Sequence, residues 1–181
     1  MGQFDTAIAA LRRAVVLDPL ARSSHLALAR ALYLARRYAE SATAFGDVIS
    51  LDPVFKTAYG EKGLALYELG DLEGARAACE IQRDDWGSKY CLAMVYDKLG
   101  RHADARTELA RIQAYWGDGA PYQYGEIYAQ WGDRPKALAS LETAVRLRDA
   151  GLVYVKTDPL LDPLRREPRF EAIERELKFP K

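Results

Sequence analysis

Residues 2–19 read GQFDTAIAALRRAVVLDP, and residues 36–53 read RRYAESATAFGDVISLDP, an interval of 34 residues from position 2 to position 36. Each stretch places a small residue, Ala7 or Ser41, five positions after its first residue. An apolar residue follows four positions later, and both stretches end in Leu-Asp-Pro. The chain therefore contains an internal repeat whose period fits a pair of short helices.

Two markers, a turn residue and a small residue five positions later, return along the chain at Gly2/Ala7, Arg36/Ser41, Gly70/Ala75, Gly100/Ala105 and Gly132/Ala137. Small and apolar residues three and four apart form one stripe on a helix. Glycine suits the left-handed turn that ends a helix, and proline cannot continue a helix interior. Each unit is therefore predicted to be two helices and a tight turn. Because one such hairpin cannot bury its stripe alone, the units are predicted to stack.

The pattern resembles the tetratricopeptide repeat, with its W-x2-L-G-x2-Y, A-x3-F and closing Pro. The small residue of each first helix is matched by Ala29, Gly63, Ala93 and Gly125, and the large residue three later by Leu32, Leu66, Tyr96 and Tyr128. The leading Trp is replaced by His25, Tyr59, Lys89 and Pro121, and the closing Pro of the last two units by Gly87 and Gly117. The resemblance implies an all-α fold, a right-handed α-solenoid of helix hairpins with a C-terminal capping helix.

The predicted organisation is a repeat array over residues 1–151 followed by a cap over residues 152–181. The array comprises a half repeat at 1–21 and repeats at about 22–55, 56–85, 86–117 and 118–151. Pro168 fits the first turn of a helix. Phe170, Ile173 and Leu177 form the apolar face that this capping helix turns toward the array.

The first helix, near residues 3–17, has no helix ahead of it because Gly2 already occupies the turn. Its apolar stripe consists of Phe4, Ile8, Leu11 and Val15. Exposing such a stripe costs about 25 cal/mol per Å² of apolar surface. Two hypotheses follow: the chain is a fragment of a longer protein, or the open helix pairs with a second copy to form a homodimer.

The block D-P-L-x-D-P-L-R-x-x-P-R-F, residues 158–170, resembles the carboxyl end of tetratricopeptide tails in bacterial multidomain signalling proteins. In those proteins the tail follows a winged-helix DNA-binding domain, a nucleotide cyclase or a protein kinase. The resemblance implies a sensory or docking tail of a signalling or regulatory protein. An alternative is a segment that regulates a linked cyclase, kinase or winged-helix transcription regulator.

The charge balance indicates which classes of partner are expected, and the cysteine content bears on the cellular compartment. The 26 basic and 26 acidic residues balance, which argues against a nucleic acid or an anionic membrane as the partner. No apolar run approaches the ~20 residues of a membrane helix, and the start lacks the features of a signal peptide. Cys79 and Cys91 stand in no metal or redox spacing and are predicted to be buried free thiols. A cytoplasmic location is the resulting expectation.

Motifs for catalysis are missing from the sequence. His25 and His102 have no cysteine or second histidine at ligand spacing, so no metal site is predicted. Neither a nucleophile elbow nor a phosphate-binding glycine loop is present. We therefore expect no enzyme activity and no cofactor, and predict a protein-binding scaffold that holds a protein or peptide.

Counting around each first helix from its small residue predicts the side chains that line a concave groove. They are Leu26, Arg30, Tyr33, Leu64, Tyr67, Tyr90, Met94, Asp97, Tyr122 and Glu126. Tyrosine rings give contact area at low entropy cost, methionine adapts its shape, and arginine can bind a carboxylate. A partly apolar peptide or a helix is the predicted ligand. The alternative is that several tyrosines pack between helices and never meet a ligand.

Overall fold

The structure is a computed structural model of the chain that describes the backbone of residues 2–178 and the side chains of residues 4–178. Every regular element in that range is an α-helix or a 3-10 helix, without a strand, so the predicted all-α fold is confirmed. The helices form two compact units, residues 1–108 and residues 109–181, which divide within α7. Across the described residues no helix has both the length and the apolar character to cross a membrane.

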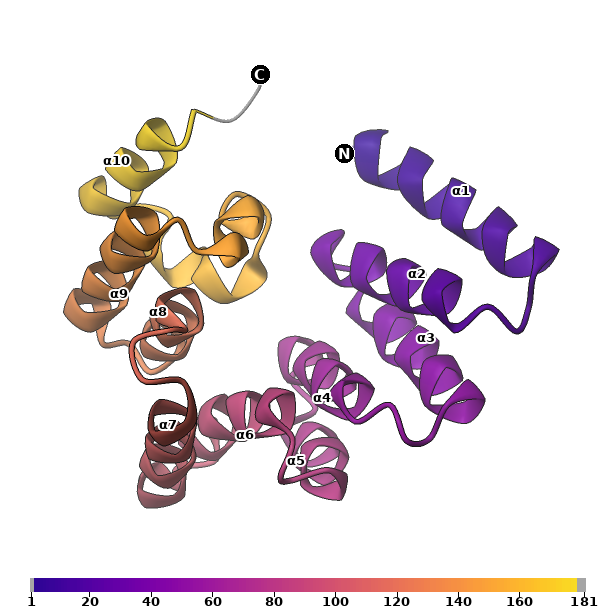
Figure 1. Cartoon of the computed structure of the whole chain (residues 1–181), viewed down its shortest axis with the longest axis horizontal. Helices are drawn as coiled ribbons and strands as arrows, with labels where there is room; N and C mark the ends of the chain where they lie inside the picture. The colour runs from indigo at the N-terminus through magenta and orange to yellow at the C-terminus, as the bar shows by residue number, and fades with distance from the viewer. Residues whose placement is uncertain (1, 179–181) are drawn as a thin grey trace. The chain divides into compact units, whose positions relative to one another are not determined.

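The first unit is a stack of consecutive helices (Figure 1). Its elements are α1 (Gly2–Leu17), α2 (Arg22–Leu34), α3 (Tyr38–Leu51), α4 (Thr57–Leu69), α5 (Leu72–Ile81), α6 (Trp86–Lys98) and the start of α7 (His102–Trp116). Each of α1 to α4 packs on the helix that follows it, and α6 packs on both α4 and α5. The two repeat markers explain this stacking: the turn residue lies between consecutive helices, and the small residue lies where two helices cross.

From the second marker pair onward, turns and crossings form at the predicted residues, whereas Gly2 belongs to helix α1 and not to a turn, and Ala7 is exposed. Gly70 and Gly100 adopt φ of 86° and 75°, and Arg36 adopts 62° at the equivalent turn. At the crossing of α2 and α3, Ala29 and Ser41 are both fully buried, and the Ser41 hydroxyl donates to the Ala29 carbonyl over 2.9 Å. A larger residue at either position would push the two helices apart.

The apolar stripe of α1 is partly covered, in contrast to the open stripe expected from the sequence. Ile8 is 1% exposed and lies in one core cluster with Leu32 and Phe45. Phe4 packs against the same cluster and is half-buried, as are Leu11 and Val15. The physical reason is that α1 packs on α2 in the way that α3 packs on α4. Ile8 is therefore unavailable as a self-association contact.

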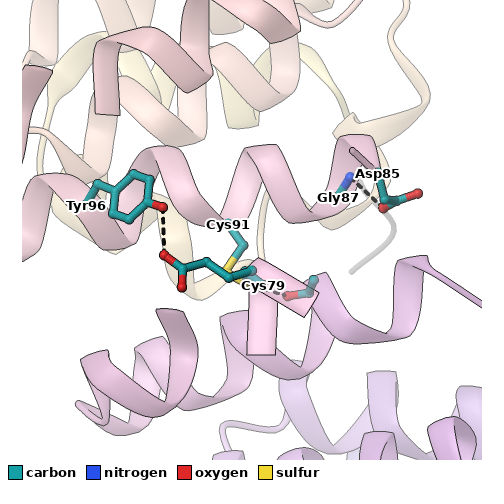
Figure 2. Close-up of a disulfide and its surroundings, with 7 residues drawn as sticks. Cys79, Asp85, Gly87, Cys91 and Tyr96 are labelled. Carbon is teal, nitrogen blue, oxygen red and sulfur yellow. Dashed lines mark hydrogen bonds between the residues drawn. A yellow bond between two sulfur atoms is a disulfide. The ribbon is translucent and has the colours of Figure 1, made fainter. Parts of the chain in front are cut away.

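A disulfide joins Cys79 of α5 to Cys91 of α6, so the prediction of free thiols is wrong (Figure 2). The stacking of α6 on α5 brings the two Cα atoms to 6.4 Å, a separation that a disulfide spans. The sequence separation of 12 residues gave no sign of this proximity.

The second unit contains one helix pair and the C-terminal cap. Its elements are the rest of α7, α8 (Pro121–Gln130), α9 (Arg134–Leu147), η1 (Ala150–Tyr154), η2 (Pro159–Leu164) and α10 (Pro168–Glu176). Leu141 of α9, Leu161 and Leu164 of η2, and Phe170 of α10 are fully buried in one cluster. The predicted capping helix is α10, which begins at Pro168 and packs on α9.

Candidate functional site

The predicted groove residues that stay accessible lie on α2 and α4. Arg30 is exposed, while Leu26, Tyr33 and Leu64 are half-buried. Leu26 and Tyr33 rest against the core beneath α2, and the Tyr33 ring lies 5.8 Å from the ring of Tyr38 on α3. We call Leu26, Arg30, Tyr33 and Leu64 the α2–α4 face. Because the inner sides of Leu26 and Tyr33 are packed, these two side chains present fixed rather than mobile contact area.

An ion pair connects α2 to α4 in this face. Arg30 Nε donates to Glu61 Oε1 over 2.9 Å, and the two side chains are 50% and 21% exposed. Burial raises the pKa of the Glu61 carboxyl, and Arg30 partly opposes that rise. Arg30 was predicted to bind a carboxylate of a ligand. Its guanidinium instead binds the Glu61 carboxylate of α4. Part of its charge is therefore already paired, and the ion pair fixes the position of the Arg30 side chain in the face.

Three other predicted groove residues, one on α4 and two on α6, are buried. Tyr67 is 7% exposed, Tyr90 is 6% exposed and Met94 is fully buried. The Tyr90 ring lies 6.2 Å from that of Trp86. These three side chains therefore do not offer the accessible contact area expected of them, and the structure follows the alternative in which tyrosines pack between helices.

Asp97, at the end of α6, has a partner within its own unit. Its Oδ1 lies 2.7 Å from Nδ1 of His102, the first residue of α7, and its side chain is 20% exposed. The carboxylate also acts on Tyr67, whose pKa is raised by burial first and then by the charges of Glu68 and Asp97. Tyr67 therefore keeps its proton, and Asp97 has a local structural role at the α6–α7 turn.

On α8 the predicted groove residues are covered by the chain's own C-terminal segment. Tyr122 is 2% exposed and Glu126 is 5% exposed. The Tyr122 hydroxyl donates to Asp158 Oδ2 over 2.8 Å, and the Gln130 amide donates to the Leu160 carbonyl over 2.6 Å. The predicted groove face of α8 is therefore packed against η2 and is not open to a ligand.

The covering segment is held by Arg165, which follows η2 directly. The Arg165 guanidinium donates to the carbonyls of Val155 and Asp158 over 2.7 and 2.8 Å, and to Glu174 Oε1 of α10 over 3.0 Å. It also lies 5.2 Å from the centre of the Phe170 ring. One side chain thus joins the residues next to η1 and η2 to α10, which holds the parts of the cap together.

Family models described as tetratricopeptide repeat match residues 1–53, 35–89, 86–111 and 122–150, which together make up more than half of the chain. The chain belongs to the tetratricopeptide repeat family. A search of curated proteins finds no match.

Several solved tetratricopeptide structures have a similar fold. The crystal structure of MamA is 21% identical with a TM-score of 0.57, covering 84% of this chain and 93% of that one. A tetratricopeptide repeat protein from Parabacteroides merdae is 14% identical with a TM-score of 0.55, covering 97% and 73%. YrrB, described as a TPR protein with an unusual peptide-binding site, is 18% identical with a TM-score of 0.53, covering 93% and 100%. At these identities the likeness concerns the fold.

Sequence reasoning missed Glu61, although the repeats contain a signal for it. Arg30 and Glu61 are 31 residues apart, close to one tetratricopeptide period. The pair Arg12–Glu40, which also joins neighbouring units, has a similar separation of 28 residues. Opposite charges one repeat apart therefore predict ion pairs between neighbouring units. Within residues 2–178 no cluster of three or more His, Cys, Asp or Glu side chains is placed to hold a metal ion.

Proposed function

We propose that this tetratricopeptide chain is a non-catalytic scaffold that binds a segment of another protein on its α2–α4 face. The observation that carries the proposal is the contrast in burial along the first helices. Leu26, Tyr33 and Leu64 keep accessible surface, whereas Tyr90 and Met94 are buried and the face of α8 is covered by η2. Binding surface is therefore concentrated on α2 and α4.

The chemistry of this face favours a peptide or helix that is partly apolar. The face carries two leucines and a tyrosine, all half-buried, together with Arg30 and its ion pair to Glu61. Aromatic and arginine side chains contribute most of the binding energy at many protein interfaces. The ion pair presents both a donor and an acceptor, which suits the amides and carbonyls of a peptide backbone. The balanced net charge of the chain also favours a protein partner over a nucleic acid or a membrane.

Selection from a random peptide display library on the immobilised full chain would provide ligands for the test. We expect selected peptides to bind Leu26→Ala plus Leu64→Ala at least about 10-fold more weakly than the wild type, as for truncation of interface hot spots. The matched control is Val16→Ala plus Val54→Ala, which alters two side chains that are 76% and 81% exposed outside the face. Thermal unfolding of each variant would confirm folding. Equal affinity for the face variant and the wild type would exclude the α2–α4 face.

A role as the tail of a larger signalling or regulatory protein is a further part of this proposal. It is supported by the resemblance of residues 158–170 to such tails, and by a C-terminal cap that Arg165 holds in place. The complete reading frame that encodes this segment is the test. A cyclase, kinase or winged-helix domain ahead of the repeats would support the role, and a frame that encodes only the repeats would contradict it.

Self-association through α1 is the second candidate function, and fewer residues support it than the sequence predicted. Phe4, Leu11 and Val15 remain half-buried, while Ile8 is already covered by α2 and α3. Sedimentation velocity at micromolar concentration would decide, with Leu11→Ser as the variant. A dimer that dissociates in the variant would support α1 as the interface. A monomer in both proteins would remove this candidate.

A further inference from the structure

On its α5 side, the boundary between the second and third repeats has few large apolar side chains. Its helix α5 has 10 residues, whereas the other second helices α3, α7 and α9 have 14, 15 and 14. The position held by Phe45, Leu109 and Leu141 in other repeats holds Cys79 in this one. The side chains that α5 buries are Ala75, Ala78 and Cys79. Apolar burial stabilises each repeat boundary, and α5 contributes less of it than α3, which buries Phe45 and Val48, or α9, which buries Leu138 and Leu141.

The disulfide lies where the missing side chain would be. Both Cys79 and Cys91 are fully buried, and their bond connects α5 to α6 (Figure 2). Gly63 of α4 packs directly on it, because a Cβ added there would be 2.0 Å from Cys79 Sγ and 2.7 Å from Cys91 Sγ. Three helices therefore meet at the two sulfur atoms, and the absence of a side chain at Gly63 makes room for them.

Two other contacts hold the ends of α6 to the second repeat. At its start, a Cβ on Gly60 of α4 would be 2.6 Å from the carbonyl carbon of Gly87, so the two backbones touch. Near its end, the Tyr96 hydroxyl donates to Glu80 Oε1 of α5 over 2.9 Å. The dashed line from Tyr96 in Figure 2 marks this bond. The disulfide holds the middle of the helix between these contacts.

We propose that the Cys79–Cys91 disulfide is a covalent clasp that takes the place of the large apolar side chain missing from α5, so that the docking of α6 on α5 depends on oxidation of the two cysteines. The bond forms when the two thiols pass two protons and two electrons to a disulfide donor, which becomes two thiols. A dithiol reductant reverses the reaction. Because both sulfur atoms are buried, the clasp stays closed until the boundary opens, as in a structural disulfide.

The clasp has a consequence for the cellular compartment. Structural disulfides form in oxidising compartments and are rare in the cytosol. The cytoplasmic location expected from the sequence relied in part on free thiols, and the bonded pair removes that support. We therefore assign the folded chain to an oxidising environment. Acid quenching and alkylation of the chain in its source cells would check this: bonded cysteines are expected, and free cysteines would contradict it.

The clasp itself is tested by hydrogen exchange of the full chain with and without a phosphine reductant. A disulfide closing a loop of this size restrains opening on the order of 100-fold. We expect amides of α6 (Trp86–Lys98) to exchange about 100-fold faster after reduction, with no change in α2 and α3. Unchanged exchange in α6 after verified reduction of both sulfurs would overturn the clasp.

A variant provides the matched control. Cys79→Ala plus Cys91→Ala should show fast exchange in α6 from the start and no response to the reductant. A response of α6 to the reductant in this variant would show that the effect does not come from the disulfide. Reduction of the wild type gives the same answer without a substitution, so the test stands if the variant fails to fold. All readouts are independent of any binding partner.

Discussion

Replacing Tyr122 with phenylalanine removes one buried hydroxyl that joins α8 to the C-terminal cap. That hydroxyl donates to Asp158 Oδ2 over 2.8 Å, and the two residues are 2% and 4% exposed. Burial, followed by the charges of Glu126 and Asp158, raises the pKa of the Tyr122 phenol far above its usual range. The hydroxyl therefore keeps its proton at neutral pH and remains a donor.

The size of the destabilisation depends on which hydrogen bonds Asp158 loses and which it keeps in Tyr122→Phe. A hydrogen bond to a charged group contributes about 1.5–3 kcal/mol, and an unpaired buried oxygen also carries a desolvation cost. Asp158 Oδ1 still accepts a hydrogen bond from the Leu160 amide over 2.9 Å, so the carboxylate loses one hydrogen-bond donor and keeps another. We expect Tyr122→Phe to destabilise the docked cap by about 2 kcal/mol, which corresponds to about 30-fold more frequent opening of η2.

Hydrogen exchange of the η2 amides in the full chain measures this opening, and urea denaturation gives the free energy of unfolding. The matched control is Tyr154→Phe, since Tyr154 is 49% exposed in the neighbouring η1. Its expected effect is below about 0.5 kcal/mol. If η2 in Tyr122→Phe exchanged at the wild-type rate, the hydroxyl bond would not hold the cap, and docking would rest on apolar burial and on the remaining bond from Gln130 to the Leu160 carbonyl.

Three further predictions concern packing and charge. Gly60→Ala should lower the free energy of unfolding by about 1–3 kcal/mol, because the added Cβ would be 2.6 Å from the Gly87 backbone. Gly46→Ala is the matched control: its Cβ would be 3.7 Å from Lys62 Nζ, and it should raise the free energy of unfolding by up to about 1 kcal/mol. Urea denaturation of the two variants compares these effects. Leu141→Ala should cost about 2.5–5 kcal/mol because Leu141 is fully buried, and a loss no larger than that of Leu147→Ala, at a residue 55% exposed, would refute the assigned core. Burial raises the pKa of Glu61 above its ordinary 4.5, so the folded chain binds this proton more tightly than the unfolded chain, and this contribution to stability falls as pH rises from 4.5 toward the folded pKa. Glu61→Gln should flatten that slope in denaturation midpoints measured between about pH 4 and pH 7, and an unchanged slope would contradict the assignment.

Much of the fold could be predicted because its signals are local. The turn markers Gly70, Gly100 and Gly132 all adopt positive φ, and the small residues Ala29 and Ala93 are fully buried. A turn needs a residue that tolerates left-handed backbone, and a crossing needs a small side chain, so both requirements appear in the residue itself. Periodicity then repeats these requirements along the chain.

The candidate site was less predictable because accessibility depends on what packs next to a side chain. Leu26 and Met94 were predicted on the same argument from helix periodicity, yet Leu26 is half-buried and Met94 is fully buried. Tyr122 points from the predicted face of α8, but η2 covers it. Helix periodicity gives the direction of a side chain, and it contains no information about the neighbour that the side chain meets.

The amino-acid sequence by itself determined that this chain forms stacked helix hairpins of the tetratricopeptide type, with turns, crossings and a capping helix at identifiable residues. Only the tertiary structure decided that Cys79 bonds Cys91, that Arg30 binds Glu61 and that η2 covers α8. The physical reason is a difference in range. Backbone conformation and amphipathic stripes depend on residues within one or two helical turns, whereas these contacts depend on distances between residues of different helices, which arise only when the helices pack.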